Sequence, residues 1–210
     1  MAEASPLLDS APLSLFAAGE PALGADRWAR HQLDEDCYLD VAEGFVAGAD
    51  SLLAELVARL PLRQSRRLMF GQYVDEPRLS CGVPLCSAPS VVRQMAAALG
   101  RRYSVTFDSC FANFYRDGSD SVAWHADREG QQILRPFVAI VSLGGPRRFA
   151  LRPRGGGPQV AWVLHSGDAA VMGGACQHHF EHAVPKTKWA PPRLSLSFRH
   201  HLTADESLRR

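Results

Sequence analysis

Apolar residues in the first half of the chain recur with the 3.6-residue period of a helix in two segments. Residues 49–60, ADSLLAELVARL, carry an apolar stripe along one face, with Asp50 in position to cap the N-terminus. That stripe consists of Leu52, Leu53, Leu56, Val57 and Leu60. Residues 88–100, APSVVRQMAAALG, predict a second helix that starts near Pro89 and ends at Gly100.

From about residue 104 the apolar positions recur with a period of two, which indicates half-buried strands. The segment YSVTFDSCFANFYR shows this alternation first, and further short runs follow, separated by the turn signals RDGSD, LGGP, RPRGGGP and HSGD. Those further runs cover residues 137–143, 147–152, 159–165, 168–173 and 192–200. Many short strands at this spacing predict a sandwich, jelly roll or barrel. The fold class is therefore α+β, with helices first and a β-rich half after them.

The length of 210 residues is typical of one domain with terminal extensions. Residues 1–35 are rich in Ala, Pro, Ser and acidic residues without a sustained period, so we expect a loosely structured extension there. We place the folded domain at residues 36–202, its β-rich core at about 104–200, and a C-terminal tail at 203–210.

Targeting and redox signals point to the inside of a cell. The N-terminal stretch carries acidic residues and no early Lys or Arg, which argues against a secretory signal, and no run of 18 apolar residues appears. Five Cys without a C-x-x-C pattern indicate free thiols in a reducing compartment. We expect a monomer without membrane contact, located in the cytoplasm, or in the nucleus if the source is eukaryotic.

The net charge of +1 conceals a strong asymmetry along the chain. Residues 1–55 hold 11 acidic and two basic residues, a net charge of −9, whereas residues 56–210 hold 11 acidic and 21 basic residues, a net charge of +10. A basic body suits a polyanion such as nucleic acid. Because 21 of the 23 basic residues are Arg and Ala is abundant, a coding bias accounts for the same charge equally well.

Two side chains that can bind a metal, His125 and Asp127, stand two residues apart in WHADRE. Residues i and i+2 of a strand point to the same face, so both can bind one cation. The segment QHHFEHAVP offers a third ligand among His178, His179 and His182. Two His and one carboxylate on one face of an octahedral ion leave three positions open, as in non-haem Fe(II) oxygenases. Zinc would favour more His or Cys ligands than this segment pair supplies.

A dicarboxylate co-substrate could fill two open positions through a keto acid end, and its far carboxylate would need a buried cation. The segment RLSLSFR supplies two Arg on the strand face shared by residues 193, 195, 197 and 199. With 21 Arg in the chain, such a pair also arises by chance. The order of the motifs therefore carries the interpretation: an aromatic-Asn strand, H-x-D, further strands, His, and then the two-Arg strand.

In that order, residues 113–199 resemble the AlkB family of Fe(II)/2-oxoglutarate dioxygenases. The motifs that carry the resemblance are NFYRDGSD, WHADRE, VSLG, HSGDAAVMGG, HFEHAVP and RLSLSFR, and they cover roughly half of the chain. The resemblance implies a double-stranded β-helix (jelly-roll) core with N-terminal supporting helices and a nucleotide-recognition lid at about residues 63–86. It also implies Fe(II) as the cofactor, with 2-oxoglutarate and O2 as co-substrates.

Carried over residue by residue, the resemblance implies three iron ligands, which are His125, Asp127 and His182. It implies that Asn113 and Tyr115 hydrogen-bond 2-oxoglutarate, that Arg199 clamps its distal carboxylate and that Arg193 lies beside it. Ser195 stands where the family usually has Asn, which removes one hydrogen-bonding arm from the co-substrate site.

Upstream, MFGQYVDEPR (69–78) resembles the lid of the duplex-preferring human member of the family. The resemblance implies that Phe70 inserts into a base stack, that Gly71 permits the turn, and that Arg78 faces phosphate or the pocket. Glu129 falls where family members place an acid that reads the alkylated base. The following segment LSCGVPLC lacks the aromatic that the family often has there, so no second base-stacking residue is identified.

The implied reaction is oxidative dealkylation of bases such as 1-methyladenine and 3-methylcytosine in DNA, a direct-reversal repair. It converts 2-oxoglutarate and O2 to succinate and CO2 and releases formaldehyde. Both bases carry a positive charge, which gives Glu129 an electrostatic role. Two alternatives stay open: an oxygenase acting on RNA, a protein or a small molecule, and a nucleic-acid-binding module with a vestigial site. The presence of three ligands and two Arg argues against the module.

Overall fold

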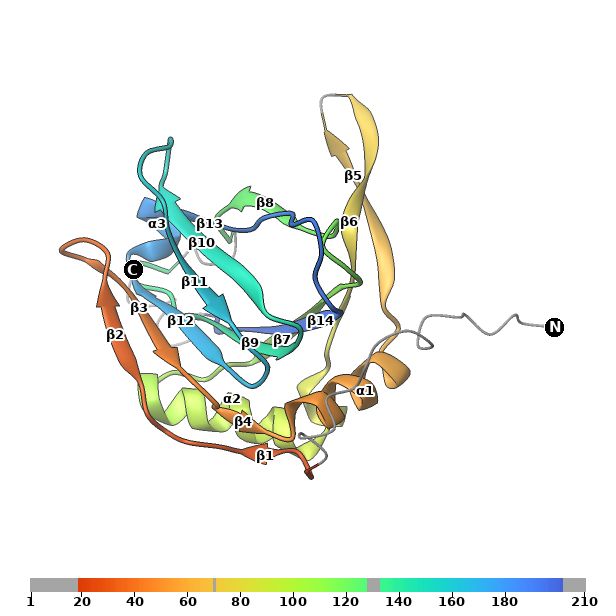
Figure 1. The fold of residues 1–210 in the computed structure, drawn as a ribbon. Coiled ribbons are helices and arrows are strands. Elements are labelled where there is room, and N and C mark those ends of the chain that lie inside the picture. The colour runs from red at the N-terminus through yellow and green to blue at the C-terminus, as the bar shows by residue number, and fades with distance from the viewer. Residues whose placement is uncertain (1–18, 70, 128–132, 202–210) are drawn as a thin grey trace.

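The computed structural model describes residues 19–69, 71–127 and 133–201. Within these ranges, the larger sheet has eight strands in the spatial order β2 (Ala29–Gln32), β3 (Cys37–Ala42), β12 (Ala169–Gly174), β9 (Val138–Gly144), β14 (Arg193–Arg199), β7 (Ser109–Tyr115), β6 (Gln72–Gly82) and β5 (Arg63–Met69). The smaller sheet has the order β11 (Val160–Leu164), β10 (Arg147–Pro153), β13 (Phe180–Val184) and β8 (Val122–His125). The two sheets face each other as a jelly roll (Figure 1), which confirms the expected α+β fold class.

Two helices support the larger sheet on the side away from the smaller one (Figure 1). They are α1 (Ala49–Arg59) and α2 (Ser90–Tyr103), the latter preceded by the short 3-10 helix η1 (Leu85–Ser87). Buried Leu52 and Leu56 of α1 pack in one cluster with apolar side chains of the sheet. The two amphipathic segments therefore form helices because each has one apolar face that the sheet covers.

Strand β14 shows how the sheet separates a structural face from a polar face. Leu194, Leu196 and Phe198 belong to the cluster between the sheet and the helices. Their neighbours at 193, 195, 197 and 199 line a cavity between the two sheets, which confirms the alternation expected from the sequence. A second apolar cluster, which includes Phe149, Leu151 and Leu164, lies between the sheets.

The helix ends differ from those expected. Gly48 is the N-cap of α1, in the left-handed conformation, and Asp50 lies in the first turn, where its carboxylate accepts a hydrogen bond from Ser166 at 2.6 Å. Gly100 does not end α2, which runs three residues further to Tyr103. A Cβ at Gly100 would lie 2.7 Å from the Val105 carbonyl oxygen, so this glycine serves a close backbone approach rather than a helix end.

Strands also occur where the sequence predicted a loose extension, so the helices do not come first. The short pair of β1 (Ala22–Leu23) and β4 (Val46–Ala47) and the strands β2 and β3 all precede or flank α1. All four residues of β2 are exposed, so the segment lacks the apolar alternation that marks a strand. It is held by backbone pairing with β3 and by the Arg30–Asp40 ion pair, at 2.7 Å.

Strands β5 and β6 form a long hairpin that rises away from the rest of the molecule (Figure 1). Gly71 at its tip has a φ of 79°, the left-handed conformation that favours glycine, in agreement with the turn expected there. Phe70, the residue expected to insert into a base stack, lies outside the described residues, as does Glu129. Among the described helices, none is both long and apolar enough to cross a membrane.

Candidate metal and co-substrate site

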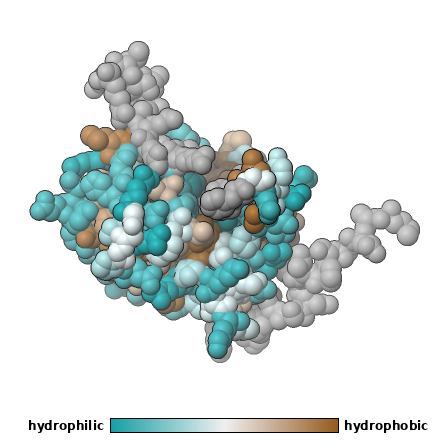
Figure 2. All heavy atoms as spheres, turned by 90° about the horizontal axis from the view of Figure 1, so that it is seen from above, coloured by the Kyte–Doolittle hydropathy of each residue, from teal (hydrophilic) through white to brown (hydrophobic). Residues whose placement is uncertain are grey.

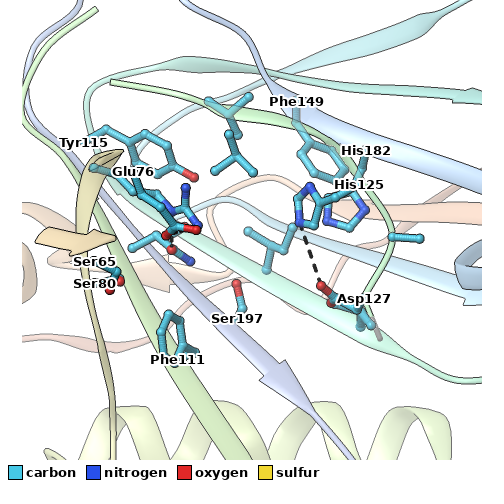
Figure 3. Close-up of a pocket in the computed structure, with 18 of the residues that line it drawn as sticks. Ser65, Glu76, Ser80, Phe111, Tyr115, His125, Asp127, Phe149, His182 and Ser197 are labelled. Atoms are coloured by element: carbon cyan, nitrogen blue, oxygen red, sulfur yellow. Dashed lines mark hydrogen bonds and ion pairs between the residues drawn. The ribbon is translucent and has the colours of Figure 1, made fainter. Parts of the chain in front are cut away.

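The cavity between the two sheets has a volume of about 770 Å³ and is lined by residues of β5, β6, β7 and β14, with others from β8, β9, β10 and β13. Its two ends differ in chemistry. Figure 3 shows His125, His182 and Asp127 gathered at one end, with Tyr115 and Glu76 at the other. The cavity therefore has one end with metal-binding side chains and a second, polar end.

The metal-binding end is built by the pairing of β8 with β13. His125 and His182 are directly opposed in that pairing, and their ring centroids lie 4.1 Å apart. Asp127 follows β8 by two residues, with Oδ1 3.8 Å from His125 Nε2. One ligand atom from each residue lies within 4.8 Å of the others. Such a set of two imidazoles and one carboxylate, facing a cavity, suits non-haem Fe(II) with open coordination positions.

Neighbouring groups orient two of these ligands, His125 and Asp127. His125 Nδ1 lies 2.9 Å from the Ala123 carbonyl oxygen, which can only accept, so Nδ1 carries the proton and Nε2 is left for a metal. Arg199 Nε donates to Asp127 Oδ2 at 2.9 Å. The backbone N–H of Asp127 donates to Gln177 Oε1, also at 2.9 Å. His125 and Asp127 are thus held in place by protein groups alone, as a preorganised site requires.

Protonation states also favour metal binding at this end. Burial and, to a smaller extent, the neighbouring His125 together lower the pKa of His182 to about 3, so the ring is neutral. Burial opposes ionisation of Asp127, but the charge of Arg199 and its hydrogen bond to the carboxylate outweigh burial and lower the pKa of this carboxyl below its usual value. A neutral imidazole and an ionised carboxylate are the states in which these groups bind a divalent cation.

Arg193 is the main charged group at the other end. It is 1% exposed, its Nε donates to Ser142 Oγ at 2.8 Å, and its guanidinium carbon lies 5.1 Å from the Tyr115 ring centroid. Among the described residues, Nη1 has no hydrogen-bond partner. Burial lowers the pKa of Arg193, which shows how unfavourable its charge is without a counter-ion. A carboxylate entering the cavity would satisfy both the charge and the unpaired N–H group.

Polar side chains join the two ends. Asn113 and Ser195 are opposed across β7 and β14, and Ser80 of β6 pairs with Asn113 from the other side. Arg78 Nε donates to Asn113 Oδ1 at 2.9 Å, and its Nη2 lies 2.9 Å from Glu76. Arg78 therefore faces the cavity, one of the two positions expected for it.

The structure brings most of the residues expected from the sequence to this one cavity. They are Arg78, Asn113, Tyr115, His125, Asp127, His182, Arg193, Ser195 and Arg199. Of the three His considered as third ligand, His182 lies in the cavity, whereas His178 contacts the Ile133 carbonyl oxygen and His179 contacts Cys37. Sequence reasoning did not identify Gln177, whose position carries no motif and only becomes meaningful once its side chain reaches Asp127.

The two Arg side chains both line the cavity but lie in different surroundings. Arg199, expected at the distal carboxylate, donates to Asp127, one of the three expected iron ligands. Arg193 was expected only beside the co-substrate, but it is the fully buried residue with an unpaired N–H group. The strand face alone could not rank them, because both residues share it.

Comparison with known proteins supports the same chemistry. Residues 57–201 match the family model of the 2OG-Fe(II) oxygenase superfamily. The chain is 39% identical over 174 residues to the alpha-ketoglutarate-dependent dioxygenase alkB homolog 3 of Mus musculus. The aligned region covers 72% of this chain and 61% of the mouse protein. It is also 33% identical over 117 residues to the DNA oxidative demethylase ALKBH2 of Arabidopsis thaliana, and this aligned region covers 44% of this chain and 37% of the relative.

Among solved structures, that of OsALKBH1 superimposes with a TM-score of 0.59 at 16% identity, covering 82% of this chain and all of that one. At this identity the likeness concerns the fold alone. The chain spans about three-fifths of the length of the mouse relative.

Proposed function

The chain belongs to the AlkB family of the 2OG-Fe(II) oxygenase superfamily, and on that premise we propose that it removes alkyl groups from nucleobases of DNA. The observation that carries the proposal is the cavity itself, with three metal ligands at one end and an unpaired buried Arg at the other. A relative named as an alpha-ketoglutarate-dependent dioxygenase supports the reaction class, and one named as a DNA oxidative demethylase supports the substrate class.

His125, Asp127 and His182 would hold the iron, with Arg199 keeping the Asp127 carboxylate turned toward it. When bound, the iron supplies oxidative chemistry: 2-oxoglutarate and O2 become succinate and CO2, and an oxygen atom enters a C–H bond of the alkyl group, which then leaves as an aldehyde.

We assign the distal carboxylate of 2-oxoglutarate to Arg193 rather than to Arg199. Arg193 has the unpaired donor and no carboxylate partner among the described residues, and it lies against Tyr115. Asn113 and Ser195 line the cavity between the two Arg and would supply further hydrogen bonds to the co-substrate. Arg199 is already engaged with Asp127, so its charge serves the metal-binding end.

The surface around the cavity suits nucleic acid. The hairpin of β5 and β6 contributes Ser65, Arg66 and Leu68 to the cavity wall and exposes Leu68 and Tyr73. Seen from the side on which the hairpin rises, the molecule is mostly hydrophilic, with apolar side chains in small patches (Figure 2). A basic side chain in the wall of a pocket and exposed apolar and aromatic side chains on the same hairpin are suited to contacts with a flipped base and its backbone.

The proposal is tested by incubating the protein with Fe(II), 2-oxoglutarate and methylated oligonucleotides, with product masses measured. Single-stranded DNA, duplex DNA and RNA carrying 1-methyladenine or 3-methylcytosine form the panel, and His125→Ala is the inactive control. Loss of one methyl group from a DNA oligomer is expected. Methyl loss from RNA alone would move the proposal to RNA, and no loss from any oligomer, with iron shown bound, would reject it.

A further inference from the structure

A second group of metal-binding side chains lies outside the cavity, where the turn between β2 and β3 meets the short helix α3 (Cys176–His179). Asp34, Cys37 and His179 place a carboxylate oxygen, a thiol sulfur and an imidazole nitrogen within 4.8 Å of one another. Cys37 Sγ lies 3.5 Å from His179 Nδ1, and Asp34 Oδ2 lies 3.6 Å from the same nitrogen. Three different metal-binding donors therefore converge on one point.

The backbone around these side chains holds them in this arrangement. The N–H groups of Leu33 and Asp34 donate to the Cys37 carbonyl oxygen, at 2.9 and 3.3 Å, and close the turn. The Asp36 N–H donates to Asp34 Oδ1 at 2.8 Å, which leaves Oδ2 facing His179. A further bond from the Ala175 N–H to the Asp36 carbonyl oxygen, at 3.0 Å, ties the turn to the start of α3. The donors are thus positioned by hydrogen bonds that do not involve a metal.

The three side chains of the cluster differ in exposure, with the thiol buried and the other two donors open to solvent. Cys37 is fully buried, whereas the Asp34 and His179 side chains are 39% and 50% exposed. An ion could therefore enter from solvent, rest on the buried sulfur and keep a water molecule as a further ligand. Burial raises the pKa of the Cys37 thiol, as does its hydrogen bond to Asp34, so a cation would have to displace the thiol proton on binding.

The donor set also indicates which ion would bind. One thiolate, one imidazole and one carboxylate are all ligand types that Zn²⁺ accepts, and the thiolate in particular favours Zn²⁺ over harder ions. The sulfur disfavours Mg²⁺ and Ca²⁺, which prefer oxygen ligands. The His125, Asp127 and His182 site has no sulfur, so the two sites differ in the ions they favour.

We propose that Asp34, Cys37 and His179 form a second metal site, separate from the iron site, that binds Zn²⁺ or a similar divalent ion. The ion would cross-link the β2–β3 turn to α3, across 142 residues of sequence. Because α3 also carries Gln177, which holds the backbone of Asp127, the second site would brace the element behind the iron ligands. This proposal does not depend on the substrate of the enzyme.

Cobalt(II) titration of the metal-free, reduced protein tests the proposal, since a thiolate ligand gives a sulfur-to-cobalt charge-transfer absorption. The wild-type protein is expected to bind two equivalents of Co²⁺, one of them with this absorption. His125→Ala should lose the other equivalent and keep the absorption. Asp34→Asn and His179→Gln should weaken the sulfur-bound equivalent by more than the roughly 10- to 100-fold that loss of an outer partner costs.

His201→Gln is the matched control, because His201 Nδ1 pairs with Asp108 at 2.8 Å on the surface without a thiol in the pair. It should leave both equivalents unchanged. Cys37→Ser should abolish the absorption, but since Cys37 is buried the decision rests on the two partly exposed variants. Absence of the charge-transfer absorption, or its persistence at wild-type affinity in both Asp34→Asn and His179→Gln, would overturn the proposal.

Discussion

Gln177→Leu should weaken iron binding although Gln177 is not a metal ligand. Gln177 is 1% exposed, its Oε1 accepts the backbone N–H of Asp127 at 2.9 Å, and its Nε2 contacts Met172 Sδ. Leu retains a side chain of similar size, so the space stays filled, but the acceptor disappears. The Asp127 N–H is then left without its partner in a buried place, or Asp127 moves to find water.

Two independent estimates give the size of this effect. A buried donor that loses its partner costs about 1–3 kcal/mol. Loss of an outer hydrogen-bond partner typically lowers metal affinity by about 10- to 100-fold, which corresponds to roughly 1.4–2.8 kcal/mol. The two ranges agree. Because Arg199 still holds Asp127 Oδ2, the loss of iron affinity should lie within these ranges, and binding should remain measurable.

Anaerobic Fe(II) titration measures the affinity, and consumption of 2-oxoglutarate at low and at saturating iron measures the consequence. Excess iron should restore most of the activity, because the ligands themselves are intact. Gln64→Leu makes the same chemical change at an exposed position of β5 and should leave the affinity as it was. If Gln177→Leu bound iron as tightly as the wild type, the side chain would not orient Asp127 and the reasoning would be refuted.

Other changes give sharper contrasts. Arg193→Met should raise the KM for 2-oxoglutarate by roughly 30-fold or more, since it removes the buried partner of a carboxylate, and equal KM values would contradict the assignment. Arg199→Met should instead weaken Fe(II) binding, measured by titration, because Asp127 loses its partner at 2.9 Å. A rise in the KM for 2-oxoglutarate with unchanged iron affinity would instead support the contact of Arg199 with the distal carboxylate. Gly100→Ala should lower the urea midpoint of unfolding, because the new Cβ would clash with the Val105 carbonyl oxygen. The same change stabilises an ordinary helix by about 1 kcal/mol, so a raised midpoint would argue against this contact.

The sequence predicted those parts of the fold that follow from local periodicity. Alternation along residues 192–200 identified the strand and the face that bears Arg193 and Arg199, and the H-x-D pair identified the metal end. It could not rank the two Arg, because which one meets Asp127 depends on where β8 ends relative to β14. Exposed β2 has no apolar pattern to detect, since its stability comes from backbone pairing with β3.

Contacts between distant segments escaped prediction for the same reason. Cys37 and His179 carry no shared motif and meet only because β3 pairs with β12, directly before α3. Gln177 is likewise an ordinary polar residue in the sequence, and its contact with Asp127 spans 50 positions. Such pairs become visible only when the topology of the sheets is known.

The alternation along β14 limits which substitutions this strand can accept, because each of its two faces has a different role. The side chains of residues 194, 196 and 198 pack toward the helices, and those of residues 193, 195, 197 and 199 line the cavity. An insertion of one residue would exchange the two faces, so it would disrupt the core and the cavity together. The long hairpin of β5 and β6 faces no such double demand along its exposed length. New substrate preferences should therefore evolve by change in the hairpin, while the strand that holds the co-substrate stays as it is.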